Sequence, residues 1–137
     1  MAAGKRKPLT VRQRRALERA TKAAESKTGL QFCVYLGPGV GHQREHAERA
    51  FVEAGLHDRP AVLIAVSANH RRVDIVTAPG VRDRVTDDDC TRAVSAMTPK
   101  FAEEKFVDGL IAGIELLADA AGAGRAGGGP DLPDVIE

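Results

Sequence analysis

Ala61-Val-Leu-Ile-Ala-Val-Ser67 is the stretch that decides the fold, because residues 61–66 form the longest unbroken apolar run in the chain. A strand that is buried on both faces has this pattern, whereas a strand with one solvated face alternates. Residues 71–78 alternate enough for a second strand. The link of residues 68–70 is short, so we expect the two strands to form an antiparallel hairpin.

The residues before this hairpin supply a third strand and two helices. Leu30-Gln-Phe-Cys-Val-Tyr-Leu36 places four apolar residues on one side with a period of two, which indicates a strand. Helical spacing of apolar residues predicts helices over residues 10–27, with Thr10 as the N-cap and Gly29 as the stop, and over residues 42–54. A right-handed crossover would then make strand 30–36 parallel to strand 61–67.

The residues after the hairpin predict two more helices and a tail. Thr86 is followed three residues later by Asp89, a capping-box pattern that starts a helix, and Pro99 is expected to end it. A second apolar stripe predicts a helix over residues 106–120. Residues 122–137 contain five glycines and two prolines without periodicity, so we expect a disordered tail.

This order of elements predicts an α/β protein with a small mixed sheet covered by helices on both faces. A chain of 137 residues is the size of one domain. No apolar run approaches the ~20 residues of a membrane helix, and no secretory signal is visible, so we expect a cytoplasmic protein without a membrane span. Cys33 and Cys90 form no ligand-spaced cluster, which argues against a disulfide framework or a cysteine zinc site.

Charge is distributed unevenly along the chain. Residues 1–28 contain nine Lys or Arg and two Glu, a balance of +7 that leaves −6 for the remainder of a chain with net charge +1. The basic first helix could therefore contact a polyanion such as nucleic acid or anionic lipid, with Arg12, Arg14 and Arg15 as candidate anion-binding residues. The alternative is that these arginines form a solvated helix face without a binding role. Aromatic residues make up 4% of the chain and Trp is absent, which argues against stacking sites for bases or sugars.

Carboxylates cluster near the start of the third helix, and the hairpin geometry should bring another one close. Because hard oxygen ligands suit Ca²⁺ or Mg²⁺, we predict a possible metal site made of Asp58, Asp83, Asp87 and Asp88. The alternative is structural: acidic residues stabilise the first turn of a helix through the macrodipole, and Asp89 completes the cap.

Two further motifs have simpler explanations. His42-Gln-Arg-Glu-His46 matches the H-x-x-E-H zinc pattern, but both histidines lie off the apolar stripe of their helix, as exposed polar residues do. The glycines of residues 37–41 lack the spacing of a nucleotide-binding loop, which favours a plain connection.

Several short segments together resemble the TPM domain family, in a shortened actinobacterial-type version of unknown function. They are Pro8-Leu9-Thr10, Thr28-Gly29-Leu30, Gly80-Val81, Val85-Thr86-Asp87 and the stretch from Phe106 to Ile114. The resemblance implies a three-layer α/β/α sandwich over residues 8–121, preceded by a basic extension (residues 1–7) and followed by the tail. TPM domains have been linked to acid phosphatase activity, divalent metal binding, photosystem repair and receptor regulation. The family's Asp-Asn-Gly entry to the hairpin is replaced here by residues 58–61, Asp-Arg-Pro-Ala, so a metal ligand is missing.

Two functional hypotheses follow. The first is a non-enzymatic interaction or regulatory module with a protein partner, acting through the basic helix and the acidic tail. The second is a divalent-metal-assisted phosphatase or other hydrolase, in which Asp58, Asp83, Asp87 and Asp88 hold Ca²⁺ or Mg²⁺ and the cation activates water. The incomplete aspartate loop favours the first hypothesis.

Overall fold

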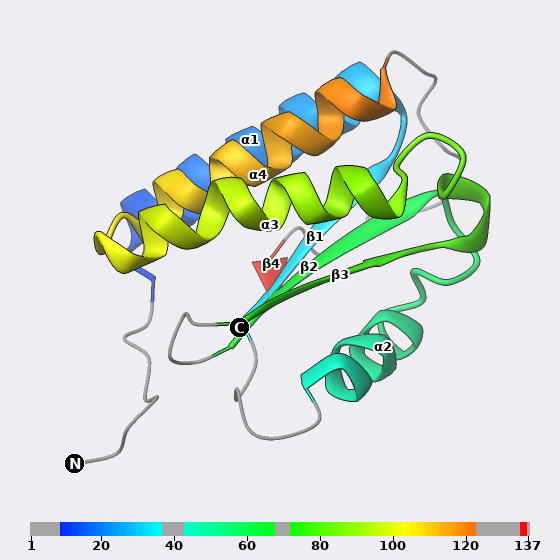
Figure 1. The fold of residues 1–137 in the computed structure, drawn as a ribbon, viewed down its shortest axis with the longest axis horizontal. Helices are drawn as coiled ribbons and strands as arrows, with labels where there is room; N and C mark the ends of the chain where they lie inside the picture. Colours follow the sequence, from blue (N-terminus) through cyan, green and yellow to red (C-terminus); the bar gives the residue numbers. More distant parts are fainter. Residues whose placement is uncertain (1–8, 37–42, 68–71, 123–134, 137) are drawn as a thin grey trace.

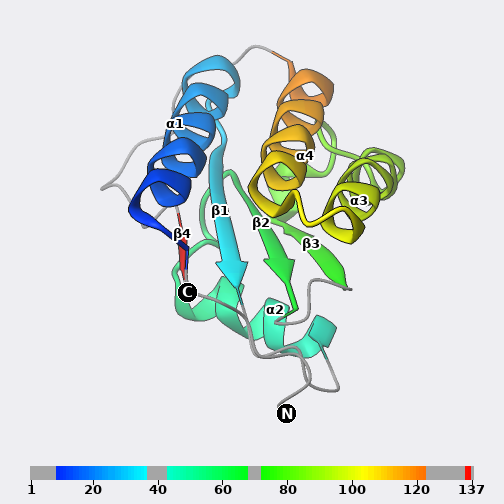
Figure 2. The same ribbon diagram turned by 90° about the vertical axis from the view of Figure 1, so that its left-hand side faces the viewer.

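The computed structural model describes residues 9–36, 43–67, 72–122 and 135–136. Its helices and strands are α1 (Val11–Thr28), β1 (Gln31–Leu36), α2 (Gln43–Glu53), β2 (Ala61–Val66), β3 (Val73–Thr77), the short 3-10 helix η1 (Pro79–Val81), α3 (Asp87–Ala102), α4 (Phe106–Ala121) and β4 (Val135–Ile136). The helices α1, α3 and α4 cover one face of the sheet, and α2 covers the other (Figures 1 and 2). The three-layer α/β sandwich with a mixed sheet is therefore confirmed.

The sheet has the order β3-β2-β1-β4. β1 and β2 are parallel, with Gln31 opposite Ala61, and β2 and β3 are antiparallel, with Ile64 opposite Ile75. Both pairings agree with the crossover and the hairpin predicted from the sequence. All six residues of β2 are buried, which explains the apolar run that defines this strand.

The helix starts follow the predicted capping residues. Thr10 accepts a hydrogen bond from the Gln13 main-chain N–H, and the Gln13 side chain accepts one from the Thr10 N–H, which completes a capping box. Gly29 ends α1 with φ 75°, in the left-handed region that glycine enters without a steric penalty. Thr86 and Asp89 form the same reciprocal cap on α3.

One prediction about a helix end is wrong, and one strand was not predicted. Pro99 lies inside α3, which continues to Ala102, because Pro99 and the residue one turn before it, Ser95, are exposed and water can satisfy the carbonyl that proline leaves without a donor. β4 was not predicted: Val135 and Ile136 lie in the segment expected to be a tail and pair in parallel with β1, while residues 123–134 of that segment lie outside the described residues. This pairing needs two residues only, too few to show a period in the sequence.

Arg84 joins the C-terminal ends of two helices to the segment before α3. Its guanidinium donates to the main-chain oxygens of Thr28 at 2.7 Å, Ala121 at 3.2 Å and Gly122 at 2.9 Å. The last carbonyls of a helix have no partner within the helix and carry the negative end of its dipole, so a half-buried cation stabilises both ends together.

None of the helices that the structure describes has the length and apolar character needed to cross a membrane.

Candidate binding groove along the open edge of β3

β3 is an edge strand of the sheet, and its hydrogen-bonding phase determines which main-chain groups face outward. The N–H of Ala78 donates to the oxygen of Ala61, and the N–H of Ser67 donates to the oxygen of Arg72. In an antiparallel ladder the residues that face the partner strand alternate. The main-chain groups of Val73, Ile75 and Thr77 therefore point away from β2, toward the open edge.

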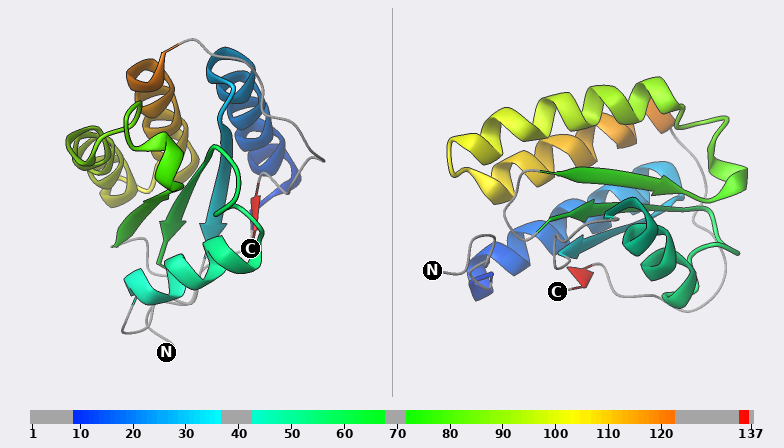
Figure 3. Two further views of the ribbon diagram at one scale, coloured as in Figure 1. Left: turned by 90° about the vertical axis from the view of Figure 1, so that its right-hand side faces the viewer. Right: turned by 60° about the horizontal axis from the view of Figure 1, so that its bottom comes forward.

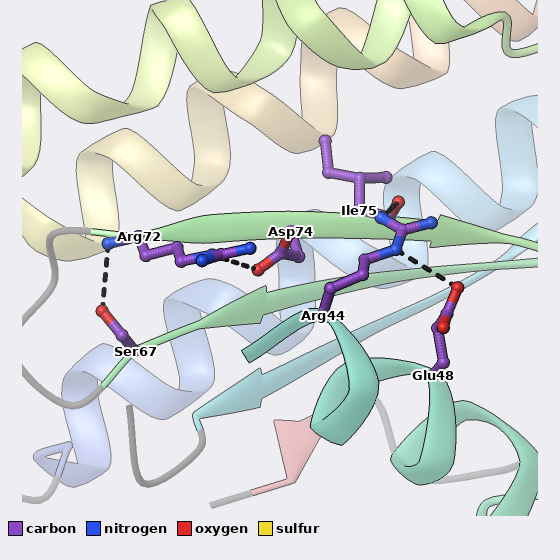
Figure 4. A network of polar contacts seen from close by, with 6 residues as sticks. All are labelled: Arg44, Glu48, Ser67, Arg72, Asp74 and Ile75. Carbon is purple, nitrogen blue, oxygen red and sulfur yellow. Dashed lines mark hydrogen bonds and ion pairs between the residues drawn. The ribbon is translucent and has the colours of Figure 1, made fainter. Parts of the chain in front are cut away.

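Arg44 of α2 contacts this edge directly (Figure 4). Its Nη1 donates to the main-chain oxygen of Ile75 at 2.8 Å, while its Nε donates to Glu48 at 3.3 Å. Because α2 lies on the opposite face of the sheet from α3, Arg44 reaches the strand from one side while the Ile75 side chain points to the other. Farther along β3, Arg72 pairs with Asp74 at 3.0 Å.

A hollow of about 600 Å³ runs along the edge of β3, and we call it the β3 groove. Its floor is β3, one wall is α3, and Arg44 of α2 forms part of the other; Figure 3 shows α2 crossing beneath the sheet. The lining residues are Arg44, Val73, Asp74, Ile75, Thr77, Arg82, Asp87, Cys90, Thr91, Val94 and Ser95. The volume falls in the range of ligand-binding clefts.

Cys90 is a thiol in the wall of the β3 groove. Burial, followed by the neighbouring carboxylates Asp87 and Asp89, raises the pKa of the Cys90 thiol to about 11, although Arg44 acts in the opposite direction. A thiol with this pKa is protonated at neutral pH, and the thiolate is the reactive form. Cys90 therefore lines the β3 groove as a protonated thiol at neutral pH.

The structure distributes the four predicted metal ligands over three separate positions. Asp58 is 83% exposed in the turn before β2, where it lies 3.3 Å from the His57 Nε2 atom. Asp83 is exposed after η1, and Asp87 and Asp88 are exposed in the first turn of α3. Among the described residues, no three His, Cys, Asp or Glu side chains lie close enough together to hold a metal ion.

One acidic residue at the start of α3 has a structural role. The main-chain N–H of Thr86 donates to Asp89 and, with Arg92, lowers the pKa of the Asp89 carboxyl below its usual value. Of the two explanations of this acidic cluster, the arrangement supports helix capping. Metal binding by Asp58, Asp83, Asp87 and Asp88 stays a prediction.

The three predicted anion-binding arginines do not share one face of α1. Arg12 and Arg15 are exposed, but Arg14 is half-buried on the side nearer the core and has an interaction partner. Arg19 completes the exposed face with Arg12 and Arg15, at a helical spacing that the sequence alone could have shown. The glycine loop and His42 lie outside the described residues, and His46 is half-buried on α2.

The β3 groove was not predicted from the sequence, although one signal pointed to it. The predicted hairpin and crossover already leave strand 71–78 with one neighbour, which makes it an edge strand. The phase that turns Val73, Ile75 and Thr77 outward, and the placement of α2 and α3 beside them, depend on tertiary packing.

The fold occurs in solved structures. The NMR structure of BA42 protein from the psychrophilic bacterium Bizionia argentinensis is similar, with a TM-score of 0.75 and 25% sequence identity over 84% of this chain and 82% of that one. The N-terminal domain of a P. gingivalis protein has a TM-score of 0.71 and 19% identity, covering 82% of this chain and 75% of that one. The N-terminal domain of the cg2496 protein from Corynebacterium glutamicum has a TM-score of 0.66 and 12% identity, covering 94% and 80%. The last two likenesses concern the fold alone.

Sequence relatives occur in Mycobacterium tuberculosis. Uncharacterised proteins of strains CDC 1551 and H37Rv are each 32% identical to this chain over 113 residues, which is 81% of this chain and 66% of the relative. The chain thus spans just under two thirds of the length of these relatives. The profile of a domain of unknown function, DUF5130, matches residues 2–118. With most of its length matched by that profile, the chain belongs to the DUF5130 family.

Proposed function

We propose that the protein is a non-enzymatic interaction module that binds an extended peptide segment of a partner protein along the open edge of β3. The observation that carries this proposal is the outward row of main-chain groups from Val73, Ile75 and Thr77 at the floor of the β3 groove, of which Arg44 occupies the Ile75 oxygen alone. An exposed row of N–H and C=O groups is a template for an added strand, and main-chain hydrogen bonds supply the affinity in such complexes.

The two walls of the β3 groove favour a single strand as its occupant. Side chains of an added strand alternate between the two sides of the sheet. One set would meet Cys90 and Val94 of α3, an apolar wall, and the other would meet the Arg44 guanidinium of α2. A segment that alternates apolar and acidic residues fits both walls. A second copy of this chain fits the β3 groove less well than a single strand, because it would bring its own α2 and α3 against the same walls.

The hydrolase alternative has less support in the geometry. A divalent cation needs several oxygen ligands, and the described residues bring no three candidate side chains together. Addition of millimolar Ca²⁺ or Mg²⁺ tests it: saturable NMR shifts at Asp58 and Asp87 would revive that hypothesis. Membership of the TPM family remains a proposal that rests on the sequence resemblance.

The binding test uses the acetylated and amidated peptide Val-Glu-Val-Glu-Val, labelled for fluorescence anisotropy, and two variants of Thr77. The N–H of Thr77 faces outward, so Thr77→Pro removes a donor from the open edge while the ladder to β2 stays intact. Thr77→Val is the matched control, because it removes the hydroxyl and keeps the N–H.

We expect Thr77→Pro to weaken binding of the peptide at least tenfold and Thr77→Val to change it less than threefold, with circular dichroism showing both variants folded. Equal binding by the proline variant and the parent protein, or no saturable binding of this peptide to the parent, would refute the proposal.

A further inference from the structure

A stripe of arginines covers the exposed face of α1. Arg12, Arg15 and Arg19 are spaced by three and four residues, which places them on one side of a helix. The opposite side of α1 is the buried one, where Leu17 and Thr21 pack into the core. We call Arg12, Arg15 and Arg19 the α1 stripe.

The α1 stripe makes no contacts that explain it structurally. Within the described part of the chain, none of its three guanidinium groups has a hydrogen bond or an ion pair. Two arginines of other elements are engaged: Arg72 pairs with Asp74, and Arg84 donates to three carbonyl oxygens. The α1 stripe therefore contributes no polar pairing to the described part of the fold.

The position of Arg12, in the first turn of α1, also opposes helix stability. The first turn of α1 contains no acidic residue, although anions are favourable and cations unfavourable near the positive end of a helix dipole. α3 shows the favourable arrangement, with Asp87, Asp88 and Asp89 in its first turn. Stabilisation of α1 therefore does not explain the positive charge of Arg12 in its first turn.

The first turns of α1 and α3 lie at opposite ends of the helical layer (Figure 1). α1 starts at the end of the layer where α3 finishes, and the aspartates of α3 lie at the other end, next to the finish of α4 (Figure 1). A polyanion held at the first turn of α1 is thus kept away from the three aspartates of α3.

We propose that the α1 stripe is a sequence-independent contact for the phosphate backbone of double-stranded nucleic acid. Seven residues separate Arg12 from Arg19, a rise of about 10 Å at 1.5 Å per residue. One strand of a duplex presents a phosphate roughly every 3.4 Å along the axis, so the stripe spans about three of them. This contact lies on α1, away from the β3 groove, and is independent of the function proposed for that groove.

Other polyanions fit this surface less well. Single strands are held by stacking on aromatic side chains, and the single Tyr of the chain, Tyr35, is half-buried in β1. Interfacial membrane binding needs apolar side chains beside the cations. Among the described residues, the exposed large apolar side chains are Val11 and Val52, and only Val11 lies on α1.

The test measures binding of a labelled 20-base-pair duplex of mixed sequence by anisotropy between 50 and 200 mM salt. Each phosphate contact contributes about −0.9 to the slope of log K against log salt concentration, so three contacts predict about −2.7 or steeper. Arg15→Gln with Arg19→Gln should reduce the steepness by about 1.8. Gln has a helix propensity similar to Arg, so α1 should keep its structure.

A second double variant, Arg49→Gln with Arg92→Gln, is the matched control, since it removes two exposed positive charges on other elements, outside the β3 groove. We expect it to leave the slope within about 0.5 of the parent value. Equal slopes for both double variants, or no duplex binding at 50 mM salt, would overturn the proposal. Binding to phosphatidylserine vesicles without binding to the duplex would also overturn it and would assign the stripe to a membrane surface.

Discussion

The Nη1 atom of Arg44 lies 2.8 Å from the main-chain oxygen of Ile75, so that a side chain of α2 holds the edge strand of the sheet. This contact occupies an acceptor on the open edge and leaves the outward groups of Val73 and Thr77 without partners among the described residues. Natural edge strands are commonly protected by charged side chains, which limits indiscriminate pairing. Arg44 therefore protects one acceptor of the edge strand and forms part of the wall of the β3 groove.

Loss of this contact should destabilise the protein moderately. Arg44→Ala removes a hydrogen bond from a charged donor to Ile75, and we expect the free energy of unfolding in urea to fall by about 1 kcal/mol. Glu48→Ala is the control, because it removes only the exposed partner of Arg44, a type of pair that contributes roughly 0–1 kcal/mol. An Arg44→Ala loss no larger than the Glu48→Ala loss would contradict this role of Arg44.

Arg84 should contribute more than Arg44 does. Arg84→Ala leaves the carbonyls of Thr28, Ala121 and Gly122 without their donor, and we expect a loss of about 3 kcal/mol. The ammonium of Arg84→Lys lacks the planar fork that reaches two helix ends, so it should recover less than half of this loss. Chemical denaturation measures the free energy of unfolding of both variants. A lysine variant as stable as the parent would refute the role of Arg84 in joining the ends of α1 and α4.

Cys90 should react slowly with thiol reagents. A pKa of about 11 against the ordinary 9.0 lowers its thiolate fraction at pH 7.4, so its alkylation by iodoacetamide should be roughly 100-fold slower than that of an ordinary cysteine and should rise about tenfold per pH unit until pH 11. Cys33 is buried and should remain unlabelled in the folded protein. Rapid labelling of Cys90 at neutral pH would show an activated thiol and reopen an enzymatic role.

The raised pKa of Cys90 also predicts that the stability of the protein falls as the pH rises in the alkaline range. The folded state keeps the thiol proton to higher pH than the unfolded state does. The resulting stability is fully present below pH 9.0 and is lost as the pH rises through about 11. The free energy of unfolding of Cys90→Ser should change less between pH 9.0 and about 11 than that of the parent protein.

The Asp89 cap has the opposite dependence on pH. The pKa of the Asp89 carboxyl is lower in the folded state than in the unfolded state. The stability that this carboxylate contributes is therefore present above pH 3.8, the ordinary value, and is lost as the pH falls below it. Asp89→Ala removes the acceptor for the Thr86 N–H and should cost about 1 kcal/mol at pH 7 and less at pH 3. Asp88→Ala, at an exposed neighbouring position, is the control and should cost less than Asp89→Ala at pH 7. Equal losses for Asp89→Ala at both pH values would contradict the cap.

The parts of the fold that local patterns determine could be predicted. The uninterrupted run in β2, the alternation in β3 and the caps at Thr10 and Thr86 each depend on residues within one element. Pro99 misled the prediction because its cost depends on whether the freed carbonyl meets water. The pairing of Val135 with β1 depends on a partner a hundred residues away.

The candidate site was harder to predict, for related reasons. Carboxylates that are close in sequence, such as Asp87 and Asp89, differ in role, because one is exposed at the helix start and the other is turned back onto Thr86. Arg14 and Arg15 adjoin in sequence but lie on different sides of α1. A groove formed by one strand and two helices has no continuous signature in the chain.

The most direct test of the central claim is amide hydrogen exchange measured by NMR, with and without the Val-Glu-Val-Glu-Val peptide. The outward N–H groups of Val73 and Thr77 should exchange rapidly in the free protein and become protected at saturating peptide, while the N–H of Ala78, already bonded to Ala61, should change little. If Val73 and Thr77 exchange at the same rate with and without bound peptide, the open edge of β3 does not accept a strand.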